Sequence, residues 1–197
     1  MRLGIMGGTF DPIHNAHLFI ADAARKAARL DRVLFIPSGN PPHKTDLVSA
    51  EERFAMTEMA TGHLPWAEPS RIETDRQGVI YTVDTLSLLK KERPEDELFV
   101  ILGADALRDM PKWKEVSRAM QLCEVVAVTR PGMSKDELLA ARDRASERTG
   151  AKVTLVWGDS PDISSSDIRL CIAKGEPLSG LVPESVARYI VERGLYT

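Results

Sequence analysis

Short apolar runs alternate along this chain with longer segments whose apolar residues recur at helical spacing. Nearly continuous runs of Val, Ile, Leu and Phe are typical of strands that are covered on both faces of a sheet. We therefore predict five buried strands, at Leu3–Met6, Val33–Pro37, Leu98–Leu102, Val125–Thr129 and Val153–Trp157.

Helix start and stop signals occupy the segments between these runs. S-x-x-E patterns mark helix N-termini, and they occur at Ser49–Glu52 and Ser134–Glu137. A last helix is expected to start at Pro183 and to end before Gly194. This alternation predicts an α/β fold with a doubly wound parallel sheet, in one domain spanning residues 1–197. Such sheets bind ligands at the carboxyl ends of their strands.

The composition is that of an ordinary globular protein and narrows the range of partners. The 197 residues (21.8 kDa) are 43% hydrophobic and 28% charged, which argues against extended disorder. The 26 Lys and Arg residues against 29 Asp and Glu give a net charge of -3, which disfavours nucleic acid as the main partner. No apolar run is long enough to span a membrane, and the N-terminus lacks a signal-peptide layout. We therefore expect a cytoplasmic protein that binds neither nucleic acid nor membrane.

The first expected loop, from Gly7 to His17, combines two glycines with two histidines. Glycines after a strand let backbone N–H groups approach a phosphate closely. His14 and His17 are about one helical turn apart, so both rings can point to one side and donate to phosphate oxygens. The same spacing fits a metal-ligand pair, or two histidines with structural hydrogen bonds only. The glycines favour phosphate binding, and we expect no metal site on the protein.

The segment after the last expected strand, from Ile163 to Arg169, contains three successive serines. Serine hydroxyls and unsatisfied N–H groups at a helix start form an anion site. Arg169 follows Ser165 and Ser166 by about one turn, so its guanidinium can share an oxygen with them. Taken alone, however, the segment is more typical of a serine N-cap followed by a surface arginine.

Together, the two segments resemble the nucleotidyltransferase superfamily with HxGH and ISSTxIR signatures. They read Gly-Gly-Thr-Phe-Asp-Pro-Ile-His-x-x-His from Gly7 and Ile-Ser-Ser-Ser-x-Ile-Arg from Ile163. Motifs between and after them are similar to those of bacterial nicotinate-nucleotide adenylyltransferases: Asn40–Lys44, Tyr81–Thr85, Gly103–Asp105, Pro111–Trp113, Thr129–Gly132 and Glu192–Tyr196. That family usually has Gly where this chain has Ala16, and the sequence leaves the effect of the extra methyl group open.

The resemblance implies a Rossmann-like fold and transfer of AMP from ATP to nicotinate mononucleotide, which gives nicotinate adenine dinucleotide and pyrophosphate in NAD biosynthesis. It implies that His17 contacts the α-phosphate, with His14 on neighbouring oxygens and Lys44 on a loop over the substrates. The implied ATP-binding residues are Gly8, Thr9, Phe10, Gly103, Asp105, Ile163, Ser164, Ser165, Ser166 and Arg169. Mg²⁺ is expected to enter with ATP, held mainly by phosphates and water.

The resemblance also implies three residues for nicotinate mononucleotide. Thr85, at a helix start, would place N–H groups near the carboxylate, Trp113 would stack on the ring, and Arg130 would hold the phosphate. Plainer interpretations stay open for several of these residues. Asp105 fits the N-cap of a short helix, Trp113 fits the cover of a helix end, and Lys44 and Arg130 fit solvated surface positions.

Two other functions stay open on the sequence. Phosphopantetheine adenylyltransferases share the first and last signatures, although that family is typically shorter and usually has Thr at the position of His14. A nucleotide sensor without turnover would not need to retain His17 together with Lys44 and Arg169. The sequence decides neither the preference for nicotinate over nicotinamide mononucleotide nor the formation of a homo-oligomer.

Overall fold

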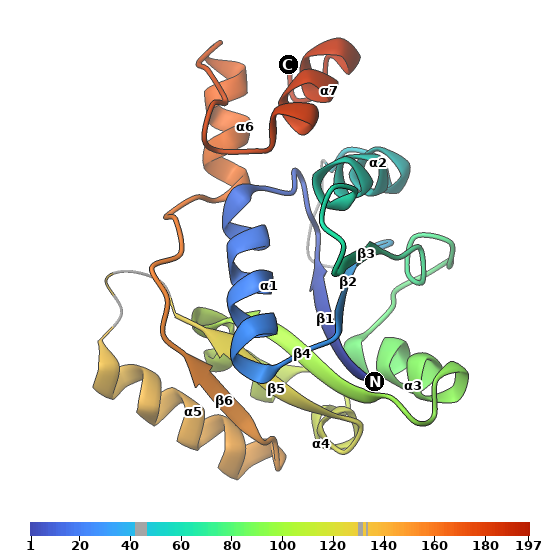
Figure 1. Cartoon of the computed structure of the whole chain (residues 1–197), viewed down its shortest axis with the longest axis vertical. Helices are drawn as coiled ribbons and strands as arrows, with labels where there is room; N and C mark the ends of the chain where they lie inside the picture. The colour runs from blue at the N-terminus through green and yellow to red at the C-terminus, as the bar shows by residue number, and fades with distance from the viewer. Residues whose placement is uncertain (42–46, 130–131, 133) are drawn as a thin grey trace.

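A parallel six-stranded sheet forms the centre of the molecule in the computed structural model (Figure 1). The structure describes residues 1–41, 47–129, 132 and 134–197. The strands are β1 Arg2–Gly8, β2 Arg32–Pro37, β3 Ala67–Pro69, β4 Glu97–Gly103, β5 Cys123–Val128 and β6 Val153–Val156, in the order β3-β2-β1-β4-β5-β6. The helices are α1 Asn15–Ala28, α2 Ala50–Thr61, α3 Thr82–Glu92, α4 Val116–Met120, α5 Lys135–Thr149, α6 Ser165–Ala173 and α7 Glu184–Arg193. Two short 3₁₀ helices, η1 Ala104–Arg108 and η2 Met110–Lys112, follow β4.

All five expected strands are present, and the structure adds a sixth. β3 consists of Ala67, Glu68 and Pro69, which show no apolar run, and its pairing with β2 is what makes it a strand. β1 is longer than expected, because Gly7 and Gly8 continue the pairing with β2. The two glycines are therefore the last residues of the strand, and the loop begins at Thr9.

The helices begin and end where the sequence signals predict, although not every expected capping hydrogen bond forms. Ser49 is the N-cap of α2, and its hydroxyl accepts the N–H of Glu52 at 3.2 Å. Ser134 precedes α5 but makes no side-chain capping bond. Gly194 ends α7 in the left-handed conformation (φ 59°), where a residue without Cβ is least strained.

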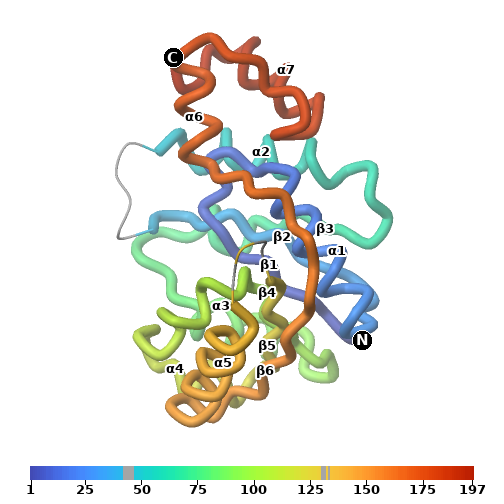
Figure 2. The backbone as a smooth tube through the Cα atoms, turned by 90° about the vertical axis from the view of Figure 1, so that its left-hand side faces the viewer, coloured from blue at the N-terminus to red at the C-terminus, as the bar shows by residue number. Residues whose placement is uncertain are grey.

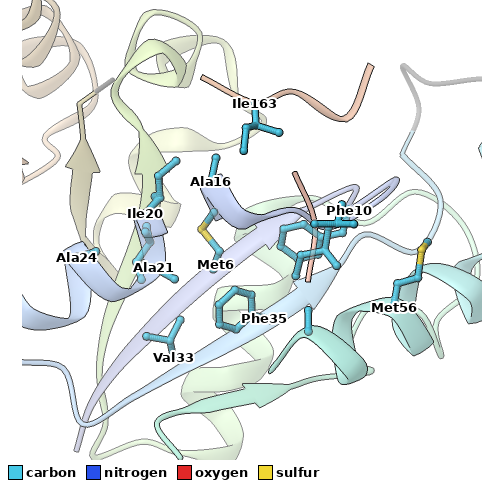
Figure 3. Close-up of a cluster of buried hydrophobic side chains, with 14 of the residues drawn as sticks. Met6, Phe10, Ala16, Ile20, Ala21, Ala24, Val33, Phe35, Met56 and Ile163 are labelled. Atoms are coloured by element: carbon cyan, nitrogen blue, oxygen red, sulfur yellow. The ribbon is translucent and has the colours of Figure 1, made fainter. Parts of the chain in front are cut away.

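Each face of the sheet carries its own cluster of buried side chains. Along β1, Leu3 and Ile5 face the cluster that packs on α3 and α5, whereas Met6 faces the cluster that packs on α1 and α2. Figure 3 shows this second cluster, with Met6 and Phe35 of the sheet below Ile20 of α1. Because successive strand residues point to opposite faces, two buried faces require the continuous apolar runs seen in the sequence.

The strand order reverses between β1 and β4, and this reversal places the site. In open α/β sheets the crevice at such a switch point, outside the carboxyl ends of the strands, is where ligands bind. The helices α6 and α7 lie beyond the carboxyl end of β1, on the same side as the start of α1 (Figures 1 and 2). The two sequence segments with candidate phosphate ligands therefore meet at one end of the sheet. Within the described residues, no helix is long and apolar enough to cross a membrane.

Candidate active site

The two predicted histidines lie face to face at the start of α1. Their ring centroids are 3.6 Å apart with an angle of 20° between the rings. His14 is the N-cap and is 2% exposed, and its backbone N–H donates to Nδ1 of His17 at 3.2 Å. Because Nδ1 of His17 is the acceptor in this bond, its Nε2 is the nitrogen that can donate to a ligand. The local fold thus sets the orientation and the tautomer of His17.

The loop between β1 and α1 packs against this pair of histidines. Phe10 is 1% exposed and meets the His17 ring edge-to-face at 4.9 Å. Its backbone has a positive φ of 50°, and its ring lies against Gly8, where a Cβ would be 2.7 Å from the Phe10 ring. Gly8 is therefore needed for the packing of Phe10, and Phe10 in turn packs against His17.

The serine-rich segment begins α6 and contacts the histidine loop directly. Ser164 caps the helix, with its hydroxyl oxygen accepting the N–H of Asp167 at 3.1 Å. Ser165 Oγ donates to the backbone oxygen of Pro12 at 3.0 Å. Arg169 donates from Nη1 to the backbone oxygen of Asp11 at 2.7 Å and from Nη2 to Ser166 Oγ at 3.3 Å. The predicted anion cradle is thus joined to the loop that leads into His14.

A buried carboxylate lies beneath this junction. Asp11 is 1% exposed, its Oδ1 accepts the Tyr196 hydroxyl at 2.8 Å, and its Oδ2 lies 3.7 Å from Arg169 Nη1. Burial and the neighbouring Asp11 charge raise the pKa of Tyr196, so its hydroxyl stays protonated and keeps donating. The C-terminal residues after α7 therefore fix the carboxylate that faces Arg169.

A buried arginine in α2 connects the loops that follow β1 and β2. Arg53 is 1% exposed, and burial lowers its pKa while the negative charge of Asp11 opposes that change. Four backbone oxygens accept hydrogen bonds from its guanidinium: Thr9 (2.8 Å), Ser38 (2.6 Å), Gly39 (3.0 Å) and Val48 (3.2 Å). Because charged donors make the stronger hydrogen bonds, this single side chain fixes the relative positions of three loop segments.

A cavity of about 430 Å³ adjoins the end of β1. Its wall comes from β1, the loop after β2, the start of α3 and the residue after η2, and it includes Gly7, Gly8, Thr9, Ser38, Pro41, Glu73, Ile80, Thr82, Thr85, Leu86 and Trp113. Thr85 and Trp113, which are 28 positions apart in the sequence, thus line one space. The Trp113 ring also packs against the core cluster on the α3 face, and its stacking on a ligand ring stays a prediction.

The expectation that Thr85 opens a helix is wrong by three residues. α3 begins at Thr82 with Tyr81 as its N-cap, and the Thr85 N–H donates to the Tyr81 oxygen at 3.2 Å. The N–H groups of the first helical turn, rather than that of Thr85, are the ones that helical geometry leaves without an internal acceptor. The Thr85 hydroxyl donates to Glu73 Oε1 at 2.7 Å.

The remaining predicted residues divide into those near the switch point and those outside the described residues. Gly103 ends β4, and Asp105 is exposed in η1 directly after it. The N-cap of η1 is Gly103, so the interpretation of Asp105 as an N-cap is wrong. Ile163 is 8% exposed and belongs to the core cluster of Figure 3. Lys44 and Arg130 lie outside the described residues.

Comparison with known proteins shows the family of this chain. Residues 5–170 match the cytidylyltransferase-like family model. A Moorella thermoacetica protein named "Probable nicotinate-nucleotide adenylyltransferase" is 44% identical over 99% of this chain and 91% of its own length. A Roseiflexus protein of the same name is 44% identical over 98% of this chain and 97% of its own length. The chain belongs to the nicotinate-nucleotide adenylyltransferase family.

The fold comparison supports the same architecture over the full length. The Plasmodium falciparum nicotinic acid mononucleotide adenylyltransferase complexed with NaAD superimposes with a TM-score of 0.81, at 19% identity, and the match covers 99% of this chain and 97% of that one. The same enzyme complexed with APC gives a TM-score of 0.79 over 99% of this chain and 96% of that chain. The predicted doubly wound α/β fold of the family is confirmed.

Ala16, which stands where the family usually has Gly, is the second residue of α1. It is fully buried in the core cluster that also contains Ile163 (Figure 3). α1 begins at Asn15, with His14 as its N-cap and His17 in its first turn. The methyl group therefore packs against the core.

Sequence reasoning gave no role to three residues that organise the site of this family member. Arg53 lies on the same buried face of α2 as Thr57 and Thr61, but no local pattern identifies the backbone oxygens that it binds. Tyr196 lies in a matching motif but shows no pattern that points to Asp11. Glu73 stands in a polar stretch and carries no local signal.

Proposed function

We propose that this chain transfers AMP from ATP to nicotinate mononucleotide and releases pyrophosphate. The observation that carries the proposal is the junction of the histidine loop with the serine–arginine segment, through Ser165 on Pro12 and Arg169 on Asp11. This junction supports a triphosphate site at the switch point of the sheet. The family membership supports the choice of acceptor.

The ATP side uses groups that donate to phosphate oxygens. The start of α6 carries unsatisfied N–H groups and a partial positive charge, which favour anions. In our proposal Ser165, Ser166 and Arg169 hold the β- and γ-phosphates, with Ile163 and Ser164 on the adenosine side. His17 donates from Nε2 to the α-phosphate, with His14 on neighbouring oxygens. Gly8, Thr9 and Phe10 supply backbone close to both nucleotides.

The chemical step needs positioning and charge stabilisation. A phosphate oxygen of the acceptor bonds to the α-phosphorus in line, while the bond from that phosphorus to the bridging oxygen of pyrophosphate breaks. Since the acceptor phosphate is already anionic at neutral pH, no general base is required. His17 and Arg169 stabilise the charge on the transferring group and on the leaving pyrophosphate.

The acceptor side uses the cavity beside β1. Its volume of about 430 Å³ falls within the range of small-molecule sites. We propose that Trp113 stacks on the pyridine ring and that the start of α3, with Thr82 in its first turn and Thr85 in its second, receives the ring carboxylate. Arg130 is proposed for the acceptor phosphate and Lys44 for the reacting phosphates.

The remaining nucleotide contacts and the metal complete the proposal. Asp105, beside Gly103 at the end of β4, would accept hydrogen bonds from ribose hydroxyls. Nucleotidyltransferases of this kind generally use a divalent metal with ATP, and we propose Mg²⁺. In the described part of the chain, no group of three or more His, Cys, Asp or Glu side chains forms a metal cage. In our proposal the ion enters with ATP and is held mainly by phosphate oxygens and water.

The direct test is pyrophosphate release from ATP and Mg²⁺ with three acceptors in parallel. We expect turnover with nicotinate mononucleotide well above that with phosphopantetheine, and the arm with nicotinamide mononucleotide measures the preference for the acid. A folded protein that binds ATP but releases no pyrophosphate with any acceptor would be a nucleotide sensor. Faster turnover with phosphopantetheine would reassign the acceptor.

A further inference from the structure

Glu73 is a carboxylate in the wall of the acceptor cavity that the mechanism above does not use. It lies between β3 and α3 and is partly buried. Its Oε1 accepts the Thr85 hydroxyl at 2.7 Å, which ties it to the second turn of α3. The cavity wall around it also includes Ile80, Leu86 and Trp113.

The second partner of Glu73 is the first part of the loop after β2. The backbone of Glu73 passes directly beside Gly39 there. At Gly39 a Cβ would lie 2.4 Å from the backbone oxygen of Glu73, so only glycine allows this approach. The Gly39 carbonyl is held from the other side by Arg53 at 3.0 Å. Glu73 therefore connects two separate walls of the cavity.

The partly buried carboxylate of Glu73 depends on the donor that it has. Burial and the nearby Asp84 raise its pKa, whereas the hydrogen bond from Thr85 and the nearby Arg76 act in the opposite direction. A carboxylate removed from water depends on such donors, and the donors are fixed in return. Losing the carboxylate would leave the Thr85 hydroxyl without this acceptor and free the start of α3 to shift relative to Gly39.

We propose that Glu73 is a positioning residue for the acceptor, holding Thr85 and Gly39 so that the start of α3 and the ring of Trp113 keep the spacing that a planar pyridine carboxylate needs. The inference rests on the function proposed above and assigns no contact between Glu73 and the reacting atoms. The hydrogen bond between Glu73 and Thr85 lies on the acceptor side of the site. Loss of the Glu73 carboxylate should therefore weaken binding of the acceptor far more than binding of ATP.

The test compares Glu73→Ala, Glu73→Gln and Asp75→Ala in the pyrophosphate assay. We expect Glu73→Ala to raise the KM for nicotinate mononucleotide about tenfold, as the loss of a charge-assisted hydrogen bond predicts, with kcat and the KM for ATP within about threefold. Glu73→Gln keeps an oxygen that accepts the Thr85 hydroxyl and should restore the acceptor KM to within about threefold of the original. Asp75, exposed in the same turn, pairs with Arg71 at 3.8 Å and should be neutral.

The KM readout separates this role from a loss of folding, because an unfolded fraction lowers the apparent kcat and leaves KM unchanged. An unchanged acceptor KM in Glu73→Ala would overturn the proposal while the function stands. Equal increases in the KM for ATP and for the acceptor would show a general structural role and would also overturn it, as would a Glu73→Gln variant as impaired as Glu73→Ala. If the unmodified protein fails to use nicotinate mononucleotide, the function and this inference fall together.

Discussion

Arg169 donates a hydrogen bond from Nη1 to the backbone oxygen of Asp11 at 2.7 Å, although the two residues are 158 positions apart in the chain. The bond joins the serine-rich segment at the start of α6 to the loop between β1 and α1. Nη2 of the same side chain donates to Ser166 Oγ. One planar guanidinium therefore contacts both the loop before α1 and a serine hydroxyl of α6. The arrangement of the site therefore depends on this long-range hydrogen bond.

Replacing Arg169 should therefore affect binding and chemistry together. We expect Arg169→Ala to lower kcat/KM for ATP by about two orders of magnitude, the scale of losing one donor to a developing charge. Arg169→Lys keeps the charge but lacks the planar fork, so it should recover only part of the loss. Steady-state kinetics at varied ATP measure both variants. Full activity in Arg169→Lys would mean that charge alone matters.

His17 should be needed for turnover to a degree that surface histidines are not. We expect His17→Ala to lower kcat by about two orders of magnitude or more, because a fixed donor to the α-phosphate is removed. His63, exposed after α2, is the matched control, and His63→Ala should leave kcat unchanged. Near-normal turnover in His17→Ala would refute the assigned role.

Replacement by Ala should have different effects at two glycines of β1: it should change ligand binding at Gly7 and stability at Gly4. At Gly7 a Cβ would meet no atom within 4 Å, and Gly7 lines the cavity. Gly7→Ala should therefore fold normally but raise the KM for the acceptor, because the new methyl group occupies space that the ligand needs. At Gly4 a Cβ would lie 2.8 Å from Leu30 and 2.9 Å from Ile101, so Gly4→Ala should lower the free energy of unfolding by about 1–3 kcal/mol. Chemical denaturation and kinetics on both variants check this pair. Reversed effects would contradict the placement of the cavity.

The strands and the helix starts beside His14 and Ser165 could be predicted because their signals are local. An apolar run shows a strand buried on both faces, and a serine run shows a helix start, without knowledge of the rest of the chain. β3 could not be predicted, because its three residues are a strand only through pairing with β2. The roles of Arg53 and Glu73 depend on carbonyl and hydroxyl groups from other elements, which no local pattern records.

Ala16 should contribute to stability and not to turnover. Ala16→Gly removes a fully buried methyl group and places glycine in the first turn of α1. We expect the free energy of unfolding to fall by about 1–2 kcal/mol, with kcat within about threefold of the original. Denaturant unfolding and steady-state kinetics measure the two effects. A large gain in activity would show that the methyl group crowds the nucleotide.

The contact between α2 and α7 should make stability depend on pH. Hydrogen bonds from Arg193 and Tyr189 lower the pKa of Glu52, at 2.7 Å and 2.6 Å respectively. A carboxyl whose pKa is depressed in the folded state stabilises it above the unfolded pKa, and that contribution is lost as pH falls through the folded value. Glu52→Gln should therefore have a lower Tm than the original protein at neutral pH, and the difference should shrink as the pH falls through the depressed pKa of Glu52. A difference in Tm that persists in acid would contradict the ion pair.

The central claim is that His17 and Arg169 act on the same triphosphate. A crystal structure of the protein with a non-hydrolysable ATP analogue tests it most directly. We expect His17 Nε2 within about 3 Å of an α-phosphate oxygen and the Arg169 guanidinium within about 3 Å of a β- or γ-phosphate oxygen. A triphosphate that contacts only one of the two side chains, or that lies away from the carboxyl end of β1, would contradict the account.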